Sequence, residues 1–175
     1  MKKIFALILL ACIALMPAAL AEKTTVTWEE TGAPLVESYG LEGDFVTLND
    51  MGLAIWVPSD LVYTEPSEED AAAGRYALFI DQDQECALTV DTINVEGMTL
   101  DQALQNAIDN GMTEPEIVNI NGLDCVTYGD PNNNLGAVVL VDTNSNMIIF
   151  SFMPVDSDEG KLAYGVISTS LMPAA

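Results

Sequence analysis

The alternation of apolar and polar residues predicts β-strands along most of the chain. The first two runs, residues 45–48 and 53–57, are joined by turn formers at 49–52, and Pro58 ends the second run. This pattern predicts a hairpin near the start of the domain. Further strands are predicted at 76–80, 86–95, 117–120, 123–128, 137–141 and 147–152.

Two segments have the spacing of amphipathic helices. In the first, Thr99 and Gln102 form a capping box and Gly111 suits the C-terminal end. Its apolar face would hold Leu100, Ala103, Leu104, Ala107 and Ile108. The second helix begins with the acids of 156–159, which complement the helix dipole. Its apolar stripe would hold Leu162, Ala163, Val166, Ile167 and Leu171.

Shorter helices are predicted nearer the N-terminus. Residues 22–41 form a lead-in, in which Thr27 and Glu30 have the spacing of a capping box and Gly40 suits a helix end. Residues 66–74 contain enough acids and alanines for one or two helical turns.

The order of these elements defines the fold class. Asn121-Gly122 lies between two predicted strands and is the strongest short hairpin signal. The chain runs as strands, a helix, a meander of strands and a last helix. This order predicts an α+β domain, an antiparallel β-sheet flanked by α-helices, over residues 42–175.

The first residues have the pattern of a removable signal peptide. Lys2 and Lys3 precede an uncharged apolar run, and Ala19-Leu20-Ala21 offers a cleavage site. A lipid-modified Cys12 is the rival interpretation, but the residues before it fit a lipobox poorly. Residues 1–21 are therefore expected to be removed, which places the mature chain outside the cell or in the periplasm or cell envelope.

Charge restricts the partners of the mature chain. Two of the five basic residues lie in the signal, so 27 acids face three bases and the formal charge becomes −24. Such a surface repels phosphates, which argues against nucleic acid and anionic membranes as partners. Solubility is the favoured explanation of the charge, and attraction of cations or of a basic partner is the functional one.

Histidine is absent and two cysteines remain after cleavage. The absence of histidine excludes Ser-His and Cys-His catalysis and His-bound zinc. Cys86 and Cys125 form a disulfide or stay buried as free thiols, and the sequence favours neither alternative.

Several acidic segments have oxygens at alternate positions, as a calcium loop requires. They are 81–85, 130–134 and 142–146, with a shorter cluster at 156–159. None has the glycine or the terminal glutamate of an EF-hand loop, so turn formation is the favoured explanation. A pair of carboxylates could hydrolyse glycosides, but with 27 acids some pair will have the required spacing by chance.

Four features of the element order resemble one known family. They are an early strand pair ending in Leu53-Ala54-Ile55-Trp56-Val57-Pro58, a helix opened by Met98-Thr99-Leu100-Asp101, the Asn121-Gly122 hairpin and a last helix finishing near Ser170-Leu171. Together they resemble the PsbP-like fold over roughly residues 42–172. The resemblance implies an antiparallel sheet flanked by helices that serves in binding or assembly, and it transfers no functional residue.

The sequence thus predicts a secreted acidic domain that binds an extracellular or envelope protein and is not an enzyme. No catalytic, cofactor-binding or metal-binding residue is predicted, and no cofactor is expected. The alternatives are a calcium-dependent adhesion or assembly module and a paired-carboxylate hydrolase. The sequence does not specify the partner or the oligomeric state.

Overall fold

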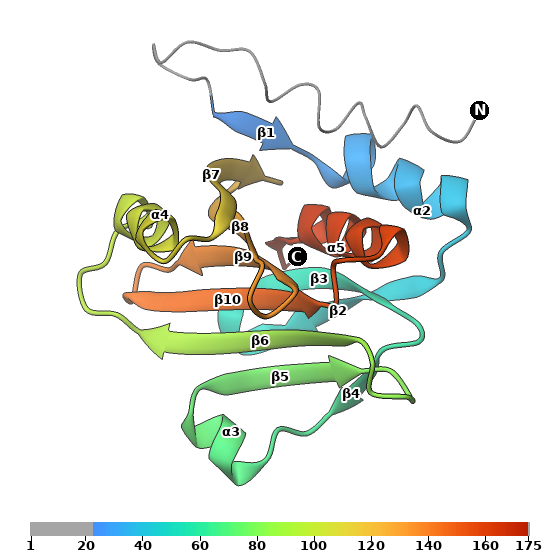
Figure 1. Cartoon of the computed structure of the whole chain (residues 1–175), viewed down its shortest axis with the longest axis horizontal. Helices are drawn as coiled ribbons and strands as arrows, with labels where there is room; N and C mark the ends of the chain where they lie inside the picture. Colours follow the sequence, from blue (N-terminus) through green and yellow to red (C-terminus); the bar gives the residue numbers. More distant parts are fainter. Residues whose placement is uncertain (1–22, 175) are drawn as a thin grey trace.

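The structure, a computed structural model, describes residues 23–174 and contains two β-sheets with helices around them (Figure 1). The predicted signal peptide at 1–21, with Cys12, lies outside the described residues. Within 23–174, no helix is both long enough and apolar enough to cross a membrane.

The larger sheet has eight strands in the order β1-β7-β8-β9-β10-β6-β5-β4. Neighbouring strands are antiparallel except β1 and β7, which are parallel. The strands are β1 Thr24–Val26, β4 Val62–Thr64, β5 Arg75–Ile80, β6 Ala87–Asn94, β7 Thr113–Ile120, β8 Leu123–Asp130, β9 Leu135–Val141 and β10 Asn146–Met153.

The smaller sheet has the order β11-β3-β2, with β2 Gly43–Leu48, β3 Leu53–Pro58 and β11 Met172–Pro173. The helical elements are η1 Trp28–Gly32, α2 Ala33–Tyr39, η2 Asn49–Met51, α3 Glu68–Ala72, α4 Leu100–Asp109 and α5 Asp158–Ser170. The predicted α+β class is therefore confirmed, although the strands form two sheets rather than one.

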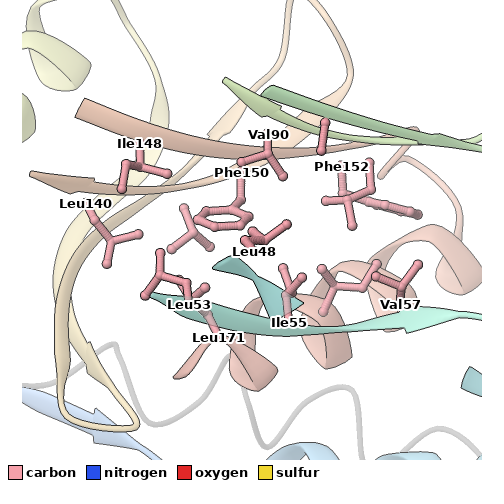
Figure 2. Packing of buried hydrophobic residues seen from close by; sticks show 14 of the residues in the cluster. Leu48, Leu53, Ile55, Val57, Val90, Leu140, Ile148, Phe150, Phe152 and Leu171 are labelled. Carbon is pink, nitrogen blue, oxygen red and sulfur yellow. The ribbon is translucent and has the colours of Figure 1, made fainter. Parts of the chain in front are cut away.

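The main core lies between the two sheets. Figure 2 shows Leu48 and Ile55 of the small sheet facing Val90 and Phe150 of the large one. Alternate residues of β10, β6 and β5 point into this layer because side chains along a strand alternate between its two faces. Ile167 of α5 and Leu171, which directly follows the helix, complete the core.

Helix α4 covers part of the opposite face of the large sheet, over β7, β8 and β9. Ala103 packs there against Val126 and Val139. The predicted capping box is confirmed: Thr99 Oγ1 accepts from Gln102 N at 3.2 Å, and Gln102 Oε1 accepts from Thr99 N at 2.8 Å. At the other end Gly111 adopts a φ of 73°, as a glycine that ends a helix does.

The lead-in residues pack onto the rest of the fold. Strand β1 pairs with β7, and η1 lies against α5. The capping box predicted at Thr27 does not form: its hydroxyl donates to the Glu30 carboxylate at 3.2 Å and caps no backbone amide. A single turn of π-helix begins there instead, and α2 ends at Gly40 with a φ of 62°.

The predicted Asn121-Gly122 hairpin is confirmed, and the Asn121 side chain also forms hydrogen bonds outside the turn. Both residues have positive φ, 48° and 88°, as a type I′ turn requires. Asn121 Oδ1 accepts from Trp28 N at 2.7 Å, and Nδ2 donates to the carbonyls of Thr169 and Leu171, each at 2.8 Å. One side chain thus joins the β7–β8 turn, η1 and the end of α5.

Candidate functional site

The acidic loops considered as calcium sites lie at two ends of the large sheet. The register pairs Met153 with Ala87 and Phe152 with Gly136, so the β5–β6 and β8–β9 loops share one end. The β9–β10 loop lies at the other end, where Val95 N donates to Ser145 O at 2.9 Å. The three loops therefore do not converge on one site.

The Asp130 carboxylate closes its own loop. It accepts from Asn132 N at 2.9 Å and from Asn133 Nδ2 at 2.6 Å. These hydrogen bonds, the one from the Asn133 side chain foremost, lower the pKa of Asp130 because they favour the ionised form. Its oxygens therefore have partners within the turn.

Asp142 and Asp81 also accept hydrogen bonds from residues of their own loops. Asp142 Oδ1 accepts from Asn144 N and Asn146 N, both at 2.8 Å. Burial raises the pKa of Asp142, but hydrogen bonds from Asn146 and Asn144 outweigh it and the net pKa is lowered. Asp81 Oδ1 accepts from Glu85 N at 2.8 Å. Within residues 23–174, no three His, Cys, Asp or Glu side chains gather as a metal site, and calcium binding stays a hypothesis to test.

The fourth acidic cluster begins α5. Ser157 is the N-cap, and its Oγ accepts from Gly160 N at 2.9 Å. Asp158 and Glu159 occupy the first turn, where a negative charge complements the helix dipole.

Both cysteines of the described chain are free thiols. Cys125 lies in β8 and Cys86 precedes β6, and the strand order places β9 and β10 between them. Because strands lie about 4.8 Å apart, the strand order alone separates the two residues by at least about 14 Å, and the register places Cys125 level with Thr92 rather than with Cys86. This distance is too long for a disulfide. Burial, followed by the charge of Asp124, raises the pKa of Cys125 to about 12, so this thiol is unreactive.

Among the carboxylates, the pKa is raised at Glu116, first by burial and then by the charge of Glu114. Glu116 lies on the half-buried part of β7, opposite Thr127 of β8. It lines neither of two hollows in the described chain. One is a cavity of about 10 Å³ under α5, the other a shallow depression of about 290 Å³ beside the β6–α4 loop, which includes Glu96 and Gln102.

Two of the three described bases are neutralised by acids. Lys23 Nζ lies 2.5 Å from Asp124 Oδ2, and this pair lowers the pKa of Asp124. Arg75 Nε donates to Asp91 Oδ1 at 2.5 Å on the large sheet. Lys161, in α5, is exposed. The accessible surface is therefore dominated by negative charge.

The two tryptophans pack with Phe45 around the small sheet. The ring centroids of Trp28 and Phe45 lie 5.1 Å apart in an edge-to-face arrangement, and those of Trp28 and Trp56 lie 6.2 Å apart. Trp56 is buried, whereas 43% of Phe45 is exposed. Other large apolar residues on the surface are Tyr39, Val62, Tyr63, Ile93 and Ile108.

Phe45 belongs to β2, which pairs with β3 on one side and forms the edge of the small sheet on the other. Ser59 N donates to Glu42 O at 2.9 Å, which fixes which backbone groups face β3. By the alternation of an antiparallel ladder, residues 44, 46 and 48 bond to β3, and Gly43, Phe45 and Thr47 turn their N–H and C=O groups outward.

The exposed pair Val62 and Tyr63 in β4 was not predicted to be in a strand. The signal was present as a short β-favouring run, Val62-Tyr63-Thr64, between Pro58 and Pro66. Three residues are too few to show a periodic pattern, so the sequence alone does not distinguish this segment from a loop.

These features together define an α+β protein with a PsbP-like fold. The solution structure of cyanobacterial PsbP (CyanoP) from Synechocystis sp. PCC 6803 is similar, with a TM-score of 0.51, 12% identity, and 75% of this chain and 92% of that chain covered. At this identity the likeness is one of fold, which confirms the predicted resemblance. No protein-family model and no curated protein matches the sequence.

Proposed function

We propose that the mature chain is an exported, non-enzymatic module that binds another protein through its acidic surface. The observation that carries the proposal is the distribution of charge. Lys23 and Arg75 are held by aspartates, and apart from Lys161 the remaining surface carries exposed acids with a few exposed aromatic and aliphatic side chains. Such a surface favours a cationic partner, which it attracts from a distance.

The turns that present these acids are internally bonded, which supports a binding role. Asp81, Asp130 and Asp142 each accept a hydrogen bond from a backbone amide of their own loop. A surface held in one conformation loses less entropy when it binds a partner than a mobile one does. The PsbP-like fold is consistent with this role, because function in such a fold resides in the surface it presents.

Affinity capture tests the proposal directly. The chain from residue 22 onward, immobilised, is exposed to a surface extract of the producing organism and washed with rising salt. We expect one protein to be retained in a fixed ratio and released by salt, because screening weakens attraction between exposed charges.

The matched control is the same chain immobilised after denaturation, which keeps the charge but loses the surface. A partner retained by the folded chain and absent from the control supports the proposal. An identical set of basic proteins on both columns would contradict it, because charge alone would then explain the retention.

A further inference from the structure

Strand β2 is the longest of the four strands that form sheet edges in the described chain. The large sheet ends in β1 and β4, of three residues each, and the small sheet ends on its other side in β11, of two residues including Pro173. Short strands and prolines are the means by which proteins block edge pairing. Strand β2 has six residues and contains neither proline nor lysine.

The backbone of this edge is ready to pair. Gly43, Phe45 and Thr47 direct N–H and C=O groups away from β3, as the Ser59–Glu42 hydrogen bond establishes. Asp44, Phe45 and Thr47 are exposed, so solvent reaches this edge. An added strand would satisfy these groups with backbone hydrogen bonds, the mode known as β-augmentation.

Side chains on both faces of this edge offer contacts. Phe45 is 43% exposed and is held by Trp28, so it presents a fixed apolar surface. On the opposite side, β5 and β4 extend the large sheet beyond the small one (Figure 1). Tyr63 of β4 is 55% exposed and packs on Phe79, which faces the core. One face of a strand added beside β2 would therefore continue the face that carries Phe45, and its other face would be directed toward the large sheet.

The charge around β2 selects the kind of segment. Residues 24–74 contain no lysine or arginine, and Glu42 and Asp44 lie at the start of the strand with Asp50 just beyond it. A second copy of this chain would bring acid against acid, which is unfavourable between neighbouring strands. A lysine- or arginine-bearing strand would form opposite-charge pairs across the same positions.

We infer that β2 is the docking edge for an extended, basic segment of another protein, which adds to the small sheet as its fourth strand. Apolar side chains of that segment pack beside Phe45, and its basic side chains lie near Glu42 and Asp44. This inference rests on the proposed binding function and gives it a site and a class of ligand.

The first test uses a synthetic peptide of alternating lysine and valine, long enough to match β2, and the mature chain. We expect saturable binding that weakens with salt, and no binding of the peptide with glutamate in place of lysine. N-methylation of one alternate set of peptide amides should abolish binding, and methylation of the other set should leave it unchanged. That difference is specific to strand pairing, because only alternate amides face a neighbouring strand.

The second test changes the edge itself. Thr47→Pro removes an outward N–H and leaves the β3 ladder intact, so binding should weaken about tenfold, whereas Thr47→Val should leave it unchanged. Glu42→Gln with Asp44→Asn should weaken binding about two- to fivefold and flatten its salt dependence. A thermal melt of each variant shows whether it remains folded.

The outcomes separate this inference from the proposed function. Absence of peptide binding, or equal loss with both methylation patterns, would overturn the β2 site. If the natural partner is captured equally well by Thr47→Pro and by the unchanged chain, the binding function stands and the β2 inference is wrong. A dimer of the chain alone that Thr47→Pro makes monomeric would replace the basic partner with a second copy.

Discussion

Asn121 joins three parts of the molecule that lie far apart in the sequence. Its side chain accepts from Trp28 N and donates to the carbonyls of Thr169 and Leu171. Asn121→Ala removes these hydrogen bonds. It also places an alanine at a φ of 48°, a left-handed conformation that asparagine can stabilise with local hydrogen bonds and alanine cannot. We expect a loss of about 2–4 kcal/mol in the free energy of unfolding, measured by denaturant titration.

Asn106→Ala is the matched control for that change. Asn106 is exposed on α4, where alanine has the higher helix propensity, so this variant should be as stable as the unchanged chain or slightly more stable. Equal effects of the two substitutions would show that the Asn121 side chain does not hold these segments together.

Glu116 should give a distinct pH dependence. Burial raises its pKa in the folded state, so its ionised form opposes folding. As far as Glu116 is concerned, the free energy of unfolding is highest below the unfolded pKa of about 4.3, where the carboxyl is neutral in both states. It falls as pH rises through the folded pKa. Glu116→Gln should therefore raise the melting temperature at pH 7.

The gain from Glu116→Gln should shrink as pH falls below about 4, where the carboxyl is protonated in both states. Glu96→Gln, in an exposed loop, serves as the control and should change little at either pH. A gain from Glu116→Gln that persisted undiminished in acid would contradict the assigned cause.

At the scale of elements, the contact of α5 with β9 depends on a glycine. A Cβ at Gly136 would come within 2.7 Å of the Tyr164 ring, whose hydroxyl donates to Ala137 O at 2.9 Å. Gly136→Ala forces this ring to move and should destabilise the fold by about 1–3 kcal/mol.

Gly165→Ala, on the same helix as Tyr164, is the paired control. A Cβ at Gly165 meets no atom within 4 Å, and alanine favours the helix by about 0.5–1 kcal/mol. Denaturant titration should therefore show opposite signs for the two glycine-to-alanine changes. The same sign for both would mean that the packing around Tyr164 is looser than described.

The sequence predicted the elements whose signals are local. The capping box of Thr99 and Gln102 and the Asn121-Gly122 turn each lie within a few residues, and both formed as expected. The strand pairings between distant segments did not follow from any local signal. Strands β1, β4 and β11 have three residues or fewer, which is too short for periodicity to identify.

The sequence did not indicate the β2 edge as a binding site, for a related reason. Residues 45–48 were predicted as a strand, but the exposed edge of β2 depends on which strands pair with it, which is decided by tertiary contacts. The capping-box prediction at Thr27 failed because the hydroxyl bonded to the Glu30 carboxylate instead of serving a backbone amide. Local spacing does not distinguish these two partners.

At the scale of the whole molecule, repulsion among the acids should dominate the response to salt. The folded chain holds 27 acids closer together than the unfolded chain does, against three bases after residue 21. Screening of this repulsion by salt should therefore raise the melting temperature. In a domain of this size, about 1 kcal/mol of added stability corresponds to a rise of about 2–4 °C.

Calcium at matched ionic strength distinguishes screening from specific binding. The carboxylates of Asp130 and Asp142 already accept hydrogen bonds from their own loops, so calcium should add little beyond its ionic strength. A flat or falling response to sodium chloride would contradict the repulsion argument. A saturable rise with calcium alone would favour the calcium-dependent alternative.

The central claim is that this acidic, PsbP-like module binds another protein at its β2 edge. Photo-cross-linking in intact producing cells tests it most directly, with a photo-reactive amino acid in place of Thr47 at the β2 edge and, as control, in place of Asn132 at the β8–β9 loop. We expect one discrete adduct from position 47, containing a basic segment of a second protein, and none of comparable yield from position 132. No adduct from either position, or the same diffuse set of adducts from both, would contradict the claim.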